Sequence, residues 1–207
     1  MAAPDRRHQL LEAALEVFSR QGFNGTTTKE VAAAAGVTEA IIFRHFPSKQ
    51  ALYTAVLDYK AQSPELQEFL AEVKEHMERN DDEGVLRSIA LSVLKAYRND
   101  PRYERVLLFA ALEGHEQGLN HNRDLALPIF ELLTDYVARR QREGALRDFP
   151  ARAIVGAVAG MAKNYAMVTE MFGYCPEVSD EAVVETFIRI VMNGIRPRCG
   201  EETENNR

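Results

Sequence analysis

The sequence has few of the features that mark membrane-spanning or secreted proteins. No apolar run among its 207 residues approaches the ~20 residues that a membrane-spanning helix needs. Glu12 and Glu16 interrupt the apolar positions near the start, so we see no signal-peptide core and expect a cytoplasmic protein. Two cysteines, Cys175 and Cys199, are too few for a disulfide framework. In a reducing compartment we expect neither a structural disulfide nor a redox role for them.

Motifs for catalysis are missing too. There is no glycine-rich phosphate loop and no nucleophile elbow, and serine is scarce. His115 and His121 stand six residues apart, whereas a zinc-protease helix carries two histidines four residues apart. We therefore predict that the protein is not an enzyme, with no catalytic residue, no metal and no cofactor. A metal-binding helical enzyme is the less favoured alternative.

What is present is helical periodicity along the whole chain. Few β-branched runs and no hairpin signals occur, which predicts an all-α fold. A break near residues 60–64 divides the chain into a domain of residues 1–60 and one of residues 61–207. Beyond this break we expect helices at residues 64–79, 84–97, 103–116, 122–142, 150–172 and 179–195, with a loop at 117–121.

The segment 26–61 is typical of a helix-turn-helix DNA-binding unit. Thr28 and Thr38 are placed to cap two short helices, and Gly36 stands between them where the backbone needs positive φ. Ile42 and Phe46 are four residues apart, so both can face inward from the second helix. The remaining faces of that helix are then left for DNA.

Over roughly residues 8 to 60 the chain resembles the TetR family of bacterial transcriptional regulators. Beyond that segment only length and helical content are similar. The resemblance implies an N-terminal three-helix helix-turn-helix DNA-binding domain joined to a larger helical ligand-binding and dimerisation domain. It rests on Phe18, Gly22, Phe23, Thr27, Thr28, Val31, Ala32, Ala35, Gly36, Val37, Phe46, Lys49 and Leu52.

The resemblance also implies roles for individual residues. Thr28, His45 and Lys49 would contact phosphates, and residues 38–41 would form the base-reading end of the recognition helix. Phe43 stands where the family usually has Tyr, so one hydroxyl contact to phosphate is absent. The predicted DNA-binding residues are Thr28, Thr38, Glu39, Ala40, Ile41, Phe43, Arg44, His45 and Lys49.

Three of these residues also have a chemical reading of their own. The family often has Lys or Arg, then Gly, near Glu39 and its neighbour; here Glu39 can accept a hydrogen bond from a cytosine amino group, and Ile41 can touch a thymine methyl. Lys49 lies in the first turn of a helix, where a cation opposes the helix dipole. A phosphate nearby would explain it, and a solvated surface lysine is the alternative.

Charge is distributed unevenly along the chain, whose net charge is −6. Residues 1–62 carry seven Lys and Arg against six Asp and Glu, while the remainder carries 18 against 25. The acidity therefore belongs to the C-terminal part, as expected for a DNA-binding head on an acidic body. The head is only weakly basic, so we expect modest non-specific affinity for DNA.

The last two expected helices are the candidates for self-association. The helix near 150–172 is apolar on most faces and rich in small residues, and the last helix has a wide apolar face that includes Ile188. We predict a homodimer through residues 151–172 and 179–195, with packing inside one subunit as the alternative. A two-fold dimer requires a palindromic operator in double-stranded DNA.

Polar groups embedded in apolar helices are candidates for contact with a small-molecule inducer. In the alternative, Asn164 and Tyr165 form hydrogen bonds within a core and the methionines fill gaps. The predicted function is a repressor that an inducer of unknown identity releases from its operator. Control by a protein partner, or constitutive DNA binding, is the other possibility. The predicted ligand-binding residues are Phe109, Glu113, Met161, Asn164, Tyr165 and Val168.

Overall fold

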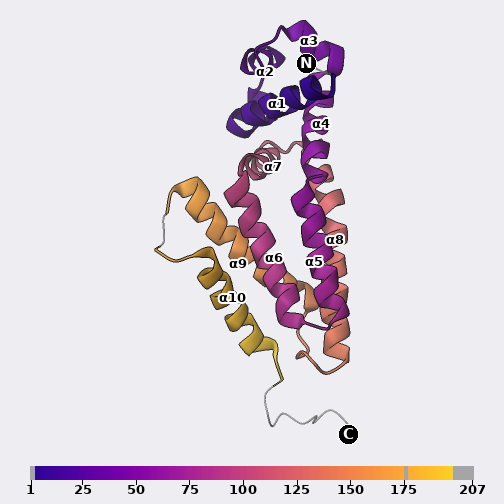
Figure 1. Cartoon of the computed structure of the whole chain (residues 1–207), viewed down its shortest axis with the longest axis vertical. Helices are drawn as coiled ribbons and strands as arrows, with labels where there is room; N and C mark the ends of the chain where they lie inside the picture. Colours follow the sequence, from indigo (N-terminus) through magenta and orange to yellow (C-terminus); the bar gives the residue numbers. More distant parts are fainter. Residues whose placement is uncertain (1–2, 175–176, 198–207) are drawn as a thin grey trace. The chain divides into compact units, whose positions relative to one another are not determined.

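The computed structural model describes residues 3–174 and 177–197 (Figure 1). All regular elements in this part of the chain are helices, as predicted. None of the described helices is long and apolar enough to cross a membrane. Cys175 and Cys199 lie outside the described residues. The helices are α1 (Ala3–Gly25), α2 (Thr28–Ala34), α3 (Glu39–His45), α4 (Lys49–Ala61), α5 (Pro64–Glu78), α6 (Asp82–Asn99), α7 (Arg102–Glu113), α8 (Glu116–Arg142), α9 (Ala151–Phe172) and α10 (Asp180–Ile195).

The helices form two compact units. The first contains residues 1–66 and 99–126, and the second contains residues 67–98 and 127–207. Residues 99–126 belong to the first unit because α7 packs against α1, and Val106 of α7 is buried in the same apolar core as the N-terminal helices. The boundary that we placed between residues 60 and 61 therefore divides the chain differently from its packing.

The core of the first unit is built on one stripe of α1. Leu10, Ala14 and Phe18 recur every four residues and are completely buried, which is the spacing that keeps side chains on one helical face. Ile42 of α3 and Leu52 of α4 join them in the same cluster. Full burial of a large apolar side chain contributes about 1.5–3 kcal/mol, so α1 is the element that positions α2, α3 and α4.

The second unit is built around apolar faces of α9 and α10, which pack against each other. Val155, Val158 and Ala162 of α9 are completely buried, and Val184 and Ile188 of α10 are buried with them. The inner faces of the two helices are thus used within one subunit. Any association between subunits through these two helices must therefore use their outer faces.

Ion pairs fix the ends of helices in this second unit. Arg140 on α8 donates from Nε to Asp82 Oδ1 at 2.7 Å, and the Tyr136 hydroxyl donates to the same oxygen at 2.6 Å. Arg98 at the end of α6 donates from Nη2 to Asp180 Oδ1 at 2.8 Å. Because Asp180 begins α10, this pair ties the start of α10 to the end of α6.

The predicted loop at residues 117–121 is wrong, since α8 begins at Glu116 and is helical through this stretch. The chain breaks two residues earlier, where Gly114 ends α7 with φ +64°. Gly118 lies within α8, at a position where there is no room for a side chain. A Cβ at Gly118 would lie 2.7 Å from Ala110 Cβ and 2.9 Å from the Tyr53 hydroxyl. Close packing therefore requires a glycine at this position of α8, although a glycine in the sequence suggests a loop.

Candidate nucleic-acid interface and ligand groove

Helix α2 begins with a reciprocal capping arrangement. Thr27 Oγ1 accepts from the backbone N–H of Glu30 at 3.2 Å, and Glu30 Oε2 accepts from the backbone N–H of Thr27 at 2.8 Å. The hydrogen bonds from Thr27 lower the pKa of the exposed Glu30 carboxyl. Our assignment of Thr28 as the cap is wrong by one residue, because the acid three positions along that completes such a cap follows Thr27. Thr28 is instead the first helical residue.

Helix α3 has an inner face and an outer face, as predicted. Ile42 and Phe46 pack into the core and are almost completely buried. Gly36 turns the chain between α2 and α3 with φ +65°. Thr38 has the extended backbone of a cap residue, although its side chain makes no capping hydrogen bond. Of the predicted DNA-binding residues on this helix and its cap, Thr38, Ala40, Phe43 and Arg44 are exposed, and Glu39, Ile41 and His45 are half-buried.

A side-chain hydrogen bond joins the N-terminal ends of α2 and α3. The Thr28 hydroxyl donates to a carboxylate oxygen of Glu39. The residue that we expect to contact phosphate is therefore paired with one that we expect to read a base. The Thr28 hydroxyl has one proton, so a hydrogen bond to phosphate requires it to turn away from Glu39. Glu39 has a second carboxylate oxygen and can accept from a base in either case.

Lys49 has two internal partners that sequence reasoning did not foresee. Its ammonium donates to the carbonyl oxygens of Phe23 and Thr26, both at 2.8 Å, and lies 4.3 Å from the centre of the Phe23 ring. These carbonyls and the ring explain a cation in the first turn of α4 without any phosphate. One ammonium proton is left for DNA, so the phosphate contact of Lys49 stays a prediction with a structural competitor.

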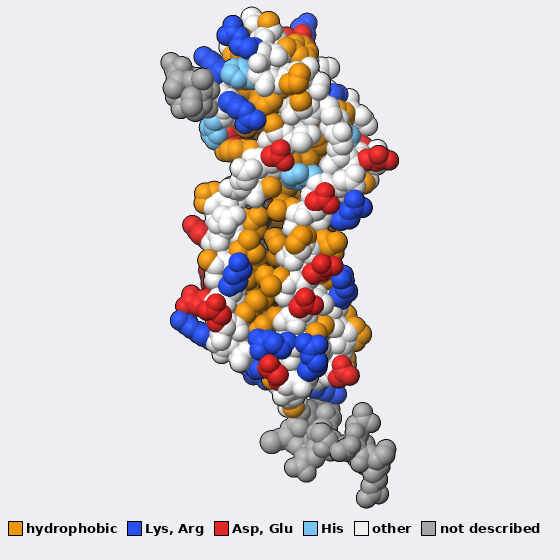
Figure 2. Space-filling view, turned by 90° about the vertical axis from the view of Figure 1, so that its right-hand side faces the viewer, with side chains coloured by type: hydrophobic (Ala, Val, Ile, Leu, Met, Phe, Trp, Pro, Cys, Tyr) orange, Lys and Arg blue, Asp and Glu red, His pale blue; other side chains and the backbone are white. Residues whose placement is uncertain are grey.

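Basic residues outside the recognition helix also belong to the first unit. Arg7 on α1 is exposed, and its guanidinium lies 5.1 Å from the centre of the Phe46 ring at the end of α3. Lys29 is exposed on α2. Figure 2 shows Lys, Arg and His side chains gathered at the end of the first unit where the N-terminal helices lie. Sequence reasoning missed these two residues, although the run Arg6-Arg7-His8 was a visible signal.

The six predicted ligand-binding residues are divided between the two units. Phe109 and Glu113 belong to the first unit, and the other four belong to the second. The Glu113 carboxylate accepts hydrogen bonds from the backbone N–H groups of Phe23 and Asn24. Phe109 packs beside it near Gly22. The long-range partner of Glu113 lies 90 residues away and leaves no trace in the local sequence pattern.

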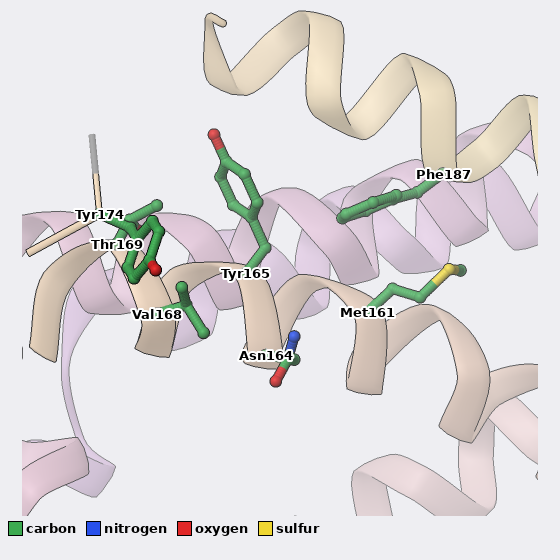
Figure 3. Close-up of a pocket in the computed structure, with 7 residues that line it drawn as sticks. All are labelled: Met161, Asn164, Tyr165, Val168, Thr169, Tyr174 and Phe187. Atoms are coloured by element: carbon green, nitrogen blue, oxygen red, sulfur yellow. The ribbon is translucent and has the colours of Figure 1, made fainter. Parts of the chain in front are cut away.

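The remaining four predicted ligand residues line a groove between α9 and α10 with a volume of about 380 Å³. In Figure 3, Tyr165 rises from α9 toward α10 and Phe187 reaches from α10 toward it, whereas Asn164 points away from α10. The two rings are 6.2 Å apart, edge to face. The Tyr165 hydroxyl is buried and has no hydrogen-bond partner among the residues that the structure describes. The lining consists of Met161, Asn164, Tyr165, Val168, Thr169, Tyr174 and Phe187.

The two histidines considered for a metal site have other surroundings. His115, in the short connection between α7 and α8, accepts on Nδ1 from the Gly118 N–H at 3.2 Å. His121 Nδ1 lies 3.6 Å from a carboxylate oxygen of Asp58 on α4. No group of three or more potential metal ligands comes together in the part of the chain that the structure describes.

Comparison with known proteins agrees with this geometry. Residues 10–56 match the family described as bacterial regulatory proteins, tetR family. The HTH-type transcriptional regulator RutR of Escherichia coli strain K12 is 27% identical over 203 residues, covering 95% of this chain and 93% of RutR. The nucleoid occlusion factor SlmA of Marinobacter nauticus is 30% identical over 145 residues, covering 70% of each chain.

A solved structure is similar over nearly the whole fold. It is that of AibR in complex with isovaleryl coenzyme A and operator DNA, with a TM-score of 0.64, 16% identity, and coverage of 89% of this chain and 97% of AibR. At this identity the likeness concerns the fold. The family match and the sequence relatives place the chain in the tetR family of bacterial regulatory proteins. The protein is a DNA-binding transcriptional regulator.

Substitutions of Lys49 and Ile41 should affect DNA binding in different ways. We expect Lys49→Ala to weaken binding to all DNA sequences about equally if its ammonium contacts a phosphate. If the ammonium only holds the chain near Phe23, the loss should fall mainly on the operator, because the placement of α3 is disturbed. Ile41→Ala should change the preference at one base pair by about 1 kcal/mol, because a methyl contact is lost. Both are measured by equilibrium binding to a set of DNA sequences.

Salt dependence separates the two roles of Lys49. If its ammonium contacts a phosphate, the slope of log affinity against log salt falls by about 1 in Lys49→Ala. An unchanged slope would assign the effect to the turn alone. If neither Lys49→Ala nor Ile41→Ala alters DNA binding, α3 and α4 are not the DNA-reading elements.

Proposed function

We propose that this chain is a homodimeric repressor that binds a palindromic operator through α3 and is released by a small molecule held between α9 and α10. The observation that carries the proposal is the division of α3 into two faces. Ile42 is buried, while Ala40, Phe43 and Arg44 are exposed on a helix that follows a tight turn. Phe43 on this outer face is 47% exposed.

The residues of the first unit then take complementary roles. Residues 38–41 are placed at the start of α3, the end of a recognition helix that contacts base edges in the major groove. Thr28, Arg44, His45 and Lys49 would bind phosphates, as the family resemblance implies. We add Arg7 and Lys29 to this group, because both are exposed and basic.

The outer faces of α9 and α10 support the proposed homodimer. On α9, the exposed residues Ala153, Ala157, Gly160 and Asn164 recur at intervals of three and four, which aligns them in one stripe of small side chains. On α10, Ile190 is 60% exposed. A stripe of small residues beside an exposed aliphatic side chain permits close helix packing by a second copy of the chain, giving a four-helix interface.

The groove lined by Tyr165 and Phe187 supports the small-molecule part of the proposal. Its volume of about 380 Å³ lies at the lower end of the range for ligand sites. The unpartnered Tyr165 hydroxyl offers one polar contact in a mostly apolar lining. The groove opens on the face that we assign to the dimer, so a partner subunit would close it. AibR, a structural neighbour, has been solved with both isovaleryl coenzyme A and operator DNA.

A footprint on the DNA that flanks the protein's own gene tests the function directly. We expect a protected palindrome with half-sites ~34–36 Å apart, because a two-fold dimer presents its reading helices to successive turns of the major groove. Protection should weaken as salt rises, since phosphate contacts release counterions. Protection that no small molecule relieves would favour constitutive binding or control by a protein partner. No protection of any DNA, including randomised sequences, would contradict the proposal.

The dimer interface can be tested with Ile190→Glu rather than with a substitution of Ile188. Ile188 is 1% exposed within its own subunit, so changing it would unfold the protein and report nothing about association. Ile190→Glu places a charge on the outer face and should yield monomers in light scattering. Leu132→Glu on α8 is the matched control, because Leu132 is also an exposed aliphatic side chain. This variant should stay dimeric. A dimer mass for Ile190→Glu would place the interface elsewhere.

The absence of tryptophan gives a clean reporter for the ligand groove. Phe187→Trp places a single tryptophan in it, and Phe149→Trp places one in a second groove on the same pair of helices, which Ile190 also lines. We expect an inducer to change tryptophan emission in the first variant only. Dimer dissociation on dilution should change both. An inducer that releases DNA without altering the Phe187→Trp signal would exclude this groove as its site.

A further inference from the structure

The segment from Gly22 to Thr27 determines where the helix-turn-helix begins. Gly22 has φ +70°, which breaks α1, and Thr27 is the cap from which α2 starts. Between them, the buried hydroxyl of Thr26 donates to the Gly22 carbonyl oxygen at 2.7 Å. A shift of this short segment would therefore move the start of α2, and with it the turn that leads to α3.

The backbone of Phe23 is held from both sides by opposite charges. Its N–H donates to Glu113 Oε2 at 3.1 Å, and the N–H of Asn24 donates to the same oxygen at 3.2 Å. The carbonyl oxygen of Phe23 accepts a hydrogen bond from Lys49 Nζ at 2.8 Å. Charge-assisted hydrogen bonds of this kind are about twice as strong as neutral ones. The carboxylate comes from the end of α7 and the ammonium from the start of α4.

The ring of Phe23 is enclosed in the same place. The Lys49 ammonium lies 4.3 Å from its centre, the His115 ring lies 4.3 Å away and the Tyr53 ring lies 5.1 Å away. Burial lowers the pKa of His115, which favours the neutral imidazole whose Nδ1 accepts from the Gly118 N–H. Tertiary contacts thus fix the backbone N–H, the backbone carbonyl and the ring of Phe23.

The space for the Glu113 carboxylate exists only because residue 22 is a glycine. A Cβ at this position would lie 2.1 Å from Glu113 Oε1 and 2.8 Å from its Cδ. The positive φ of Gly22 also disfavours any other residue. The break in α1 and the carboxylate therefore fit each other, and Glu113 fills the position that a side chain would take.

We propose that Glu113 is a positioning residue for DNA recognition, which links the end of α7 to the Gly22–Thr27 segment and so sets the placement of α2 and α3. Displacement of the end of α7 would withdraw the carboxylate from two backbone N–H groups and free the segment. This inference rests on the proposed role of α3 in reading DNA. Glu113 itself need not touch DNA.

The test compares Glu113→Gln with Glu116→Gln, a control that removes the same charge from an exposed residue three positions away. Hydrogen exchange of the peptide spanning residues 22–27 reports the contact without DNA. We expect exchange of the Phe23 and Asn24 amides to speed up about tenfold in Glu113→Gln, because one charge-assisted interaction is lost. Glu116→Gln should exchange like the unsubstituted chain.

DNA binding then reports the consequence for recognition. Affinity for the operator should fall about tenfold in Glu113→Gln while affinity for random DNA changes little, because non-specific binding depends on phosphates and not on the placement of α3. A purely structural role would lower both affinities in proportion to the folded fraction, measured by circular dichroism. Where Glu113→Gln is unfolded, Glu113→Asp takes its place: it keeps the charge, but its side chain is one methylene shorter and draws the carboxylate back from the Phe23 and Asn24 N–H groups, so we again expect faster exchange and weaker operator binding.

Two outcomes would overturn the inference. One is unchanged exchange of the Phe23 and Asn24 amides in Glu113→Gln. The other is faster exchange with unchanged discrimination between operator and random DNA, which would make the contact local only. Failure of the unsubstituted protein to bind any operator would instead contradict the proposed function, and the exchange result would still stand on its own.

Discussion

The hydrogen bonds from the Lys49 ammonium to the carbonyl oxygens of Phe23 and Thr26 are the contact on which the DNA-binding head depends. They tie the first turn of α4 to the segment from which α2 begins. Because α3 lies between these two points in the chain, both of its neighbours are fixed by one side chain. The buried faces of Ile42 and Phe46 then fix its rotation, which decides which residues face outward.

The helices of the head could be predicted because their signals are local. A glycine with positive φ, cap residues and apolar positions four apart lie within one helical turn of the structure they determine. The cap itself was misplaced by one residue, since Thr26, Thr27 and Thr28 offer the same hydroxyl and only the capping partner Glu30 selects among them. The partners of Lys49 and Glu113 could not be predicted. Lys49 donates to backbone carbonyls and Glu113 accepts from backbone N–H groups, and every residue except proline has both groups.

The two C-terminal helices show a different limit of sequence reasoning. Their wide apolar faces predict burial, but not which part is covered within a subunit and which part is left outside. Ile188 and Ile190 are equally apolar, and helical geometry turns one into the core and the other outward. The predicted ligand-binding residues show the same limit. Tyr165 and Glu113 are both polar groups in apolar helices, but Tyr165 lines a groove whereas Glu113 accepts a hydrogen bond from the backbone of α1.

The charge of the N-terminal residues bears on the proposed homodimer. The residues before position 63 carry a net charge of only +1, from seven basic and six acidic residues, so a single head neutralises few phosphates and binds DNA weakly. In the proposed dimer, two joined heads would bind the second half-site as an intramolecular event, which raises affinity without new contacts where their spacing matches the DNA. Affinity then depends on geometry more than on charge. Such a dimer would be sensitive to small displacements of its reading helices, and the proposed role of Glu113 is to restrain the segment from which α2 begins through the two backbone N–H groups bonded to it.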